Sequence, residues 1–477
     1  MGIKINLHKI DAKMTLKSSN YQLIVFNSEK SELITKSLKS KIKRKNTTLK
    51  DLTKESVTIE DENSKVIVYL YASNLEPYKR QTLIRKSLKN ILDENPEQIT
   101  LVSENEEWVE DLIYVTLINS QDLPSRKSKN TKIKLKSIQC YSNLTKLNLK
   151  EIEAVVKGNT LSRELTMTPP NDLTPTIYRS LVKKLAKQNG WKVKEYTMPD
   201  LKKMGAGAFY AVGQGSDPQD AAIMHLTYSP KNAKKHITLV GKGICFDTGG
   251  HNLKPSKYMF SMHEDMNGSS TVLGILQAAA MSKLPVKIDC WLAIAQNHIG
   301  PKAYKQNDVV KALNGKTIEI IHTDAEGRMV LADTLTLASK NKSDLIMDFA
   351  TLTGCMAVAM GDRFSGIFSN KSDIACLAVG AGRKSGERVC SFPLDEDFED
   401  DIKSDIADIK QCTLEGGPDH IHAARFLLQF LTDKNTPWLH VDLSSSNKKG
   451  GLGAANSDVN GFGVNFGFKL IQDLISK

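Results

Sequence analysis

The chain of 477 residues lacks long hydrophobic runs and paired cysteine motifs. No stretch approaches the roughly 18 consecutive apolar residues that a membrane-spanning helix needs, so we expect no membrane partner. The first twenty residues contain no continuous apolar segment, so we expect no secretory signal. The seven cysteines are scattered without a CxxC pair, which argues against a zinc ribbon or a disulfide framework and fits a reducing cytoplasm.

Aromatic residues are also scarce, at 6%, and none lies in the two most basic runs, Lys36–Lys50 and Arg126–Lys136. Both runs belong to residues 1–150, which hold 27 Lys and Arg against 18 Asp and Glu, most of the chain's net charge of +11. Basic runs can bind nucleic acid, but base stacking needs interleaved aromatic rings. We therefore favour a solvated lysine-rich surface and keep nucleic-acid binding as a second hypothesis.

A chain of this length exceeds one ordinary hydrophobic core, so two domains are expected. We predict a small N-terminal α/β domain at 1–145, because short apolar segments alternate there with amphipathic ones such as Lys79–Leu92. A connecting helix at 146–168 should end before Pro169 and Pro170, since proline cannot continue a helix. The apolar segments interpreted as strands are YQLIVF (21–26), SKVIVYLYA (64–72) and DLIYVTLI (111–118).

The rest of the chain, 169–477, alternates helical patterns with continuous apolar runs. Continuous apolar strands between helices are typical of a mostly parallel sheet that is covered on both faces. We therefore predict an α/β fold whose larger C-terminal domain has a mostly parallel central sheet flanked by helices. The strands are expected at 237–246, 287–295, 316–321 and 344–350, and the helices at 176–188, 268–281 and 329–340.

Lysine and aspartate residues stand at the end of the first of these strands. Lys242 lies between two glycines inside the apolar run, and Asp247 follows at the carboxyl end of the strand. In open α/β sheets this edge is where ligands bind. A buried lysine is costly unless it is paired, or neutral and coordinating. We therefore expect a functional site here.

Further acidic residues follow at Asp265 and, directly after the run TIEII, at Asp324 and Glu326. If the backbone is extended there, Asp324, Glu326 and Arg328 project to one side and converge. Four clustered carboxylates would repel one another, and divalent cations with their preference for oxygen ligands relieve that repulsion. The absence of HExxH argues against a single-zinc metalloprotease. A dinuclear hydrolase such as a phosphoesterase is the alternative.

Asp324-Ala-Glu-Gly-Arg328, preceded by His322-Thr323, closely resembles the signature of the leucine aminopeptidase (cytosol aminopeptidase) family. Four other segments are similar to that family's motifs in the right order, and the resemblance covers roughly residues 160–477. These segments are Pro169–Pro175, Ala211–Ser216, Gly241–Met266 and Ala350–Gly354.

The resemblance implies two divalent metal ions per chain, zinc or manganese with magnesium as a further option. The implied metal ligands are Lys242, Asp247, Asp265, Asp324 and Glu326, with Asp247 and Glu326 touching both ions. Lys242 would have to be neutral to coordinate, which needs a depressed pKa.

The resemblance also implies two catalytic residues outside the ligand set. Lys254 would stabilise the oxyanion that forms during attack by a metal-activated water. Arg328 would hold a bicarbonate ion that relays a proton. One metal would take the free α-amine of the peptide substrate, so that only the N-terminal residue is removed.

Relatives in this family are hexamers, so the resemblance implies a cytoplasmic homohexamer. It assigns the pocket for the first side chain to Met262, Thr351, Leu352 and Gly354. This chain departs from the common pattern at 416–424 and at 443–446, which leaves a preference for leucine open. His420 and His422 in the first of these segments are interpreted as structural or pocket groups, and no role is assigned to residues 296–298.

Overall fold

A computed structural model describes residues 2–11, 19–60, 65–129, 132–144 and 146–476. The chain divides into two compact units. Unit 1 comprises residues 1–156 with two short later segments, 383–386 and 449–458. Unit 2 comprises the remainder. Helix α5 (Leu149–Thr166) spans the division and ends before Pro169, where proline was expected to stop it.

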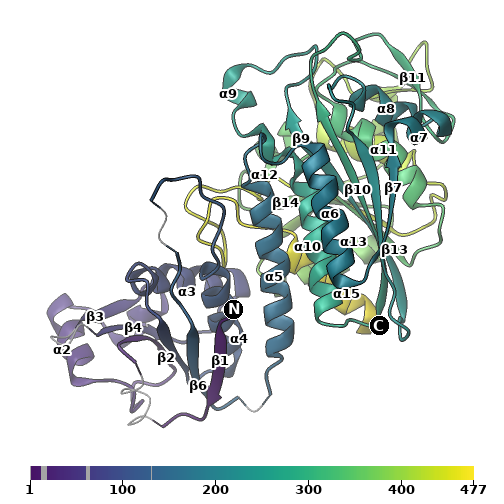
Figure 1. The fold of residues 1–477 in the computed structure, drawn as a ribbon. Helices are drawn as coiled ribbons and strands as arrows, with labels where there is room; N and C mark the ends of the chain where they lie inside the picture. The colour runs from purple at the N-terminus through teal and green to yellow at the C-terminus, as the bar shows by residue number, and fades with distance from the viewer. Residues whose placement is uncertain (1, 12–18, 61–64, 130–131, 145, 477) are drawn as a thin grey trace. The chain divides into compact units, whose positions relative to one another are not determined.

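Unit 1 is an α/β unit built on a six-stranded sheet (Figure 1). All neighbouring strands pair in parallel except β3, which is antiparallel to β4. Helices α3 (Pro77–Leu92) and α4 (Glu106–Asn119) pack against each other and against this sheet. The strand order is β1 (Lys4–His8), β6 (Ser137–Ser142), β5 (Gln98–Ser103), β2 (Tyr21–Phe26), β4 (Val66–Tyr71) and β3 (Val57–Glu60).

The strand predicted at 111–118 is wrong, because these residues lie within helix α4. Asn105 caps that helix by accepting the backbone N–H of Glu107, and every residue from Asp111 to Asn119 is buried. A run that is apolar on all sides fits a buried helix as well as a buried strand, so its periodicity could not separate the two.

The basic run at 36–50 forms helix α2 (Lys36–Lys45) and the 3₁₀ helix η1 (Leu49–Thr53). Leu38 and Ile42 face the core of unit 1, whereas the three basic residues of the last turn, 43–45, are exposed. This arrangement agrees with a solvated basic face. Two positions of the second basic run, 130 and 131, lie outside the described residues.

Unit 2 is built on an eight-stranded sheet whose four central strands are parallel. The mostly parallel sheet flanked by helices is thus confirmed, with antiparallel pairing between β14 and β17 and between β10, β8 and β7. The strand order is β15 (Val389–Ser391), β14 (Ser365–Ser369), β17 (Trp438–Asp442), β13 (Leu345–Ala350), β9 (Lys235–Asp247), β10 (Val286–Asn297), β8 (Ala222–Tyr228) and β7 (Lys192–Thr197).

Helices cover both faces of this sheet (Figure 1). One face carries α6 (Pro175–Asn189), α10 (Asn267–Met281) and α15 (Val464–Ser476), and the other carries α8 (Gly207–Gly213), α11 (Glu326–Ala338) and α14 (Asp419–Leu428). Alternation along β9 assigns its side chains to the two faces. Gly241 faces α10, where an added Cβ would lie 2.5 Å from the Cα of Ser269, whereas Val240 and Ile244 pack with α11. Lys242 therefore points to the α11 side.

The strand expected at 316–321 is shorter and belongs elsewhere. β12 (Thr317–Glu319) lies in a separate three-stranded sheet with β11 (Val309–Lys311) and β16 (Ile409–Lys410), not in the main sheet. The remaining helices after α5 are the longer α13 (Ser372–Ser385) and the short α7 (Met198–Met204), α9 (Ser256–Met259), η2 (Met262–Met266), α12 (Gly354–Met360) and η3 (Glu396–Ile402).

The seven cysteines, all within the described residues, are free thiols. Burial raises the pKa of Cys140 to about 12, as expected for a small apolar core residue. None of the described helices combines the length and the apolar character that a membrane crossing requires.

Candidate active site

The candidate site lies at the carboxyl ends of the parallel strands β9 and β10. Asp247 ends β9 and Asn297 ends β10, and the two residues are paired in register. The Asn297 amide donates to Asp247 Oδ1 at 2.8 Å and to Glu326 Oε2 at 3.4 Å. Asn297 had no role assigned from the sequence. Its position at the end of the neighbouring strand was the signal that could have found it.

Lys242 reaches the same site from inside β9. Its ammonium lies 2.8 Å from Asp265 Oδ1, 2.9 Å from Glu326 Oε1 and 3.0 Å from the carbonyl oxygen of Thr351. The side chain is 4% exposed, so these contacts are desolvated. Gly327 leaves room for it, because a Cβ there would lie 2.6 Å from the Lys242 Cε.

Asp265 comes from η2, the 3₁₀ helix that precedes α10. Its Oδ1 accepts from the Thr351 hydroxyl at 2.7 Å as well as from Lys242. Its Oδ2 is buried and has no hydrogen-bond partner in the described structure. A buried carboxylate oxygen without a donor is costly unless a cation approaches it.

The expectation of an extended backbone through Asp324, Glu326 and Arg328 is wrong. Helix α11 begins at Glu326, so residues 326 and 328 leave the helix about 200° apart rather than on one side. Glu326 turns to Lys242, while Arg328 turns to Asp419. The first turn of a helix favours an acidic side chain, which helps to explain why the helix begins at Glu326.

Lys254 joins the remaining two carboxylates. Its ammonium lies 2.9 Å from Asp247 Oδ2 and 2.6 Å from Asp324 Oδ1. The loop that carries it is fixed at both ends: the Lys254 backbone N–H donates to the Thr248 carbonyl, and Thr323 exchanges hydrogen bonds with residues 249 and 252. Lys254 is therefore a positive group held in a defined position.

The electrostatics of the cluster show more negative charge than its lysines balance. Burial raises the pKa of Asp265, and Glu326 and Asp247 raise it further against the opposing effect of Lys242. The pKa of Glu326 is raised by burial and Asp247, and that of Asp324 is raised to about 7. Burial acts to lower the pKa of Lys242, but the three carboxylates around it raise it instead. A neutral Lys242 therefore stays a prediction.

The donor set fits divalent cations. Asp247, Asp265 and Glu326 are buried, and each offers a carboxylate oxygen such that all three lie within 4.8 Å of one another. Among the described residues, this is the one group of three or more Asp, Glu, His or Cys side chains whose possible ligand atoms lie this close together. Four carboxylates face two lysines, and cations would offset the excess while giving Asp265 Oδ2 a partner.

These side chains line a cavity of about 830 Å³ in unit 2. The four residues expected to form the substrate pocket line the same cavity, together with all five expected ligands and both expected catalytic residues. Asp442, at the end of β17, fixes one wall: its carboxylate accepts the backbone N–H groups of Leu352 and Thr353 and the Thr353 hydroxyl. The pocket residues are Met262, Thr351, Leu352 and Gly354.

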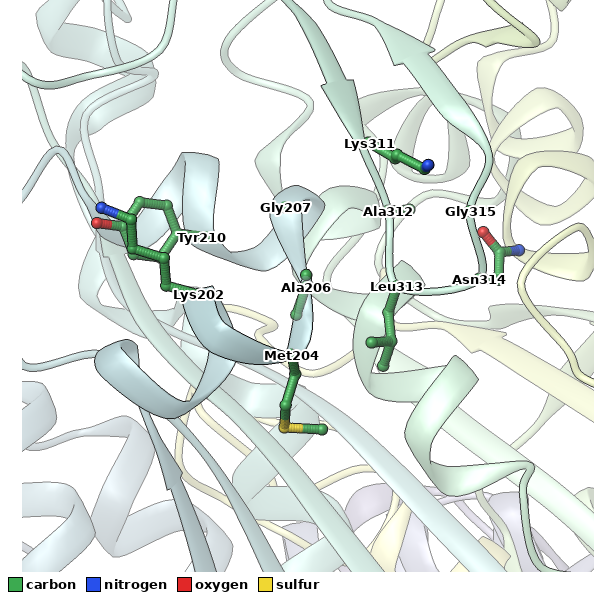
Figure 2. A pocket seen from close by; sticks show the side chains of 11 residues that line it. Lys202, Met204, Ala206, Gly207, Tyr210, Lys311, Ala312, Leu313, Asn314 and Gly315 are labelled. Atoms are coloured by element: carbon green, nitrogen blue, oxygen red, sulfur yellow. The ribbon is translucent and has the colours of Figure 1, made fainter.

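A second cavity, of about 560 Å³, lies between α7, α8 and the turn after β11 (Figure 2). Its lining includes Lys202, Tyr210, Lys311 and Asn314 but none of the carboxylates described above. Without acidic or histidine side chains in that lining, it does not offer a metal centre.

Arg328 and the segment around 416–424 differ from the expectation. The Arg328 guanidinium donates from Nη1 to the Gln411 carbonyl at 2.7 Å and from Nη2 to both oxygens of Asp419 at 2.8 Å. His422 is buried and pairs with Asp401, and His420 packs against Phe392. Both histidines are therefore structural in their contacts, as interpreted from the sequence, while Asp419 was missed.

A buried cluster of carboxylates and lysines at the carboxyl edge of a parallel sheet defines a metal-dependent hydrolase. The family model of the cytosol aminopeptidase family, catalytic domain, matches residues 160–466. A probable cytosol aminopeptidase of Prochlorococcus marinus (strain MIT 9215) is 40% identical over 359 residues, which cover 73% of this chain and 72% of that protein. This chain belongs to the cytosol aminopeptidase family.

Two solved structures share the fold over nearly the whole chain. Leucyl aminopeptidase from Trypanosoma brucei in complex with actinonin has a TM-score of 0.84 at 26% identity, with 99% of this chain and 96% of that one covered. The bottromycin maturation enzyme BotP in complex with Mn also has a TM-score of 0.84, at 25% identity and with coverages of 96% and 100%. The protein is a metal-dependent aminopeptidase, a hydrolase of the leucyl aminopeptidase type.

Proposed function

We propose that this aminopeptidase uses two divalent metal ions held by one set of side chains. The observation that carries the proposal is the buried cluster of three carboxylates within 4.8 Å of one another, with Lys242 in contact with two of them. Oxygen ligands at this density suit divalent cations. The proposed ligands are Lys242, Asp247, Asp265, Asp324 and Glu326.

Asp247 and Glu326 are the ligands proposed to touch both ions. Each pairs with a different lysine, Asp247 with Lys254 and Glu326 with Lys242, and Asn297 contacts both carboxylates. When bound, the ions would polarise the scissile carbonyl and acidify a water molecule at neutral pH. We propose zinc or manganese, with magnesium as a further option; the manganese complex of the similar BotP structure supports manganese.

Lys254 is the proposed oxyanion stabiliser. Its ammonium is held beside Asp247 and Asp324 by a loop whose backbone is hydrogen-bonded at both ends, and its side chain is 15% exposed. A fixed positive charge in a largely desolvated cavity stabilises a developing negative charge without reorganising. Removing it should slow the chemical step more than it weakens substrate binding.

The proposed metal site supports selection for peptides with a free N-terminus. One of the two ions would take the free α-amine as a ligand, and a blocked N-terminus has no such nitrogen. The first side chain would lie against four residues that line the same cavity, Met262, Thr351, Leu352 and Gly354.

Bicarbonate at Arg328 is not part of the proposal. The guanidinium is buried, and its Nη1 and Nη2 atoms already donate to Gln411 and Asp419. A second anion would have to displace a carboxylate that belongs to the chain itself. The residues present therefore do not fit a dissolved anion at this position.

We further propose that residues 169–477 form the catalytic domain, joined through the helix at 146–168 to an N-terminal domain at 1–145. By the same family resemblance we propose a cytoplasmic homohexamer. Sedimentation of the purified protein tests the assembly: a mass near six chains agrees with the proposal, and a monomer at micromolar concentration contradicts it.

The two-metal proposal is tested by counting bound manganese. Chelated protein is dialysed against Mn²⁺, and metal content is measured for the wild type, Asp265→Ala and Glu326→Ala. We expect about two ions per wild-type chain and a loss of at least one in each variant. Asp362→Ala removes an exposed carboxylate that pairs with Lys448 and serves as the control. Variants that bind as much manganese as the wild type would contradict the ligand assignment.

A further inference from the structure

Arg328 holds an anion that the chain itself supplies. Its side chain is 2% exposed and belongs to the first turn of α11. Nη2 donates to both oxygens of Asp419 at 2.8 Å each, and Nη1 donates to the carbonyl of Gln411. Charge-assisted hydrogen bonds between a guanidinium and a carboxylate are among the stronger polar contacts in proteins.

Asp419 is the first residue of α14, and the turn before this helix positions its side chain beside Arg328. Gly416 and Gly417 adopt φ angles of +81° and +93°, a region that favours glycine, and Pro418 precedes the first residue of the helix. The Asp419 side chain is 29% exposed and lines the cavity that contains Lys254 and Glu326. One side of the carboxylate is thus held by the guanidinium while the group remains accessible from the cavity.

A dissolved anion competes poorly with a tethered one. Because Asp419 is covalently part of the chain, its effective concentration at Arg328 is far above that of free bicarbonate in solution. A second anion beside Asp419 would also be repelled by the Asp419 carboxylate itself. Nη1 and Nη2 of Arg328 are thus occupied by groups of the chain itself, and the buried Nε is the guanidinium nitrogen left without a hydrogen-bond partner among the described residues.

We propose that Asp419 takes the place of an external bicarbonate ion and acts as the proton acceptor and donor of the peptidase reaction. This inference rests on the proposed function. A water molecule loses a proton to the Asp419 carboxylate as its oxygen bonds to the scissile carbonyl carbon. The C–N bond then breaks, and the proton passes from Asp419 to the departing nitrogen, which restores the carboxylate and completes the addition of one water.

The alternative is that the Arg328–Asp419 pair only fixes α14 against α11. A structural pair would be disturbed by Asp419→Ala, but added anions would not restore the rate according to their basicity. A proton acceptor lost from the cavity can be replaced by a small basic anion that fits beside the guanidinium. The two roles are therefore separated by which anions rescue the variant.

The test uses manganese-loaded, full-length enzyme and leucyl p-nitroanilide in buffer freed of carbon dioxide. We expect the wild-type kcat to change less than about twofold when bicarbonate is added. In Asp419→Ala and Asp419→Asn, kcat should fall about 100-fold. Formate, acetate or bicarbonate should restore the alanine variant by about tenfold or more, whereas nitrate, which is planar but not basic, should not. Glu415→Ala, an exposed carboxylate of the same loop, is the matched control and should behave as the wild type.

Manganese content and thermal unfolding of each variant verify that it is folded and loaded. Asp419→Asn keeps the size of the side chain, so it gives a folded protein without the base if the alanine variant does not fold. The inference is overturned if Asp419→Ala keeps full activity, if bicarbonate stimulates the wild type as strongly as the variant, or if nitrate rescues as well as formate. It is also overturned if no anion rescues a folded variant. A wild type that is inactive on every amide overturns the proposed function as well, which distinguishes the two failures.

Discussion

The two lysines of the site have different surroundings and therefore different proposed tasks. Lys242 is 4% exposed and inserted between Asp265 and Glu326, whereas Lys254 is 15% exposed and enters the cavity from a loop. Burial acts to lower the pKa of Lys254, but Asp247, Glu326 and Asp324 raise it, so its charge is present at neutral pH. Neighbouring carboxylates raise the pKa of Lys242 as well, so it is position that separates the two: Lys254 enters the cavity from a loop and suits oxyanion stabilisation, whereas Lys242 lies between two proposed ligands.

Replacing Lys254 with methionine keeps the length of the side chain and removes its charge. We expect kcat on an aminoacyl p-nitroanilide to fall by a factor of about 100 to 1,000, with a smaller change in KM, since the interaction strengthens in the transition state. Lys257→Met, on the exposed helix α9, is the control. A Lys254→Met variant with wild-type kcat would remove this residue from the mechanism.

Much of the site at this scale was predictable because motif and physical reasoning agreed. Lys242 and Asp247 were predicted as site residues because they lie within and at the end of an apolar strand. The structure brings both into the cavity. Asn297 and Asp419 were missed for a different reason. Each acts through a contact with a residue distant in sequence, Asp247 for one and Arg328 for the other, and a single sequence does not reveal such contacts.

Among the elements, strand β17 organises the wall of the substrate cavity. Asp442 at its end is buried and receives three hydrogen bonds from residues 352 and 353, which follow the neighbouring strand β13 after one intervening residue. Burial raises the pKa of Asp442, an effect that His440 and these donors oppose. Beyond the end of β13, the Asp442 carboxylate thus accepts backbone N–H groups that have no strand partner there.

Asp442→Ala should loosen this segment and displace the pocket residues Thr351 and Leu352. We expect KM to rise about tenfold with a smaller fall in kcat, and the free energy of unfolding to drop by about 2 kcal/mol because the hydrogen bonds to a charged group are lost. Asp442→Asn keeps one acceptor oxygen and should be milder on both measures. Steady-state kinetics and urea unfolding provide the measurements. Unchanged KM in the alanine variant would show that Asp442 does not hold the pocket.

Element type was predictable where length and flanking residues separated helix from strand. The strand at 237–246 and the helix at 268–281 correspond closely to β9 and α10. The error at 111–118 arose because a segment buried on all sides has no period, and the helix is specified by the cap at Asn105. The extended backbone predicted at Glu326 was wrong for a similar reason. Helix α11 begins at this residue and so sets the direction in which Arg328 points, but the charged residues alone did not indicate where the helix begins.

At the scale of the whole molecule, stability and catalysis occupy opposite ends of the main sheet. Asp289 lies near the start of β10, away from the catalytic end, and pairs with His225 at 2.8 Å and His236 at 2.7 Å. Burial acts to raise the pKa of Asp289, but hydrogen bonds from these two histidines and Thr227 lower it below its usual value. A lowered folded-state pKa contributes stability above the unfolded pKa of about 4, and that contribution is lost as the pH falls further.

Asp289→Asn should therefore destabilise the protein by about 2 kcal/mol at pH 7, and the difference from the wild type should shrink as the pH falls below about 4. Urea unfolding across this pH range measures it. Because the site lies at the other end of the strand, kcat at pH 7 and 25 °C should be unchanged. A destabilisation that is equal at pH 7 and pH 3 would contradict the assignment to the ionised carboxylate.

The mostly parallel character of the eight-stranded sheet could be predicted from the sequence, but the order of its strands could not. β9 lies between β13 and β10, and β14 lies between β15 and β17, parallel to the first and antiparallel to the second. These neighbours are set by packing between segments tens to hundreds of residues apart, whereas strand character depends on local apolar runs.

The most direct measurement compares leucyl p-nitroanilide, its N-acetylated form and p-nitrophenyl phosphate as substrates for chelated enzyme with and without added Mn²⁺. We expect hydrolysis of the free-amine amide that appears only with metal and is lost in Asp324→Ala, with no hydrolysis of the acetylated amide or the phosphate. Metal-loaded, folded enzyme that cleaves the phosphate ester and no amide, or that cleaves the blocked amide equally well, would contradict the assignment of this site to aminopeptidase chemistry.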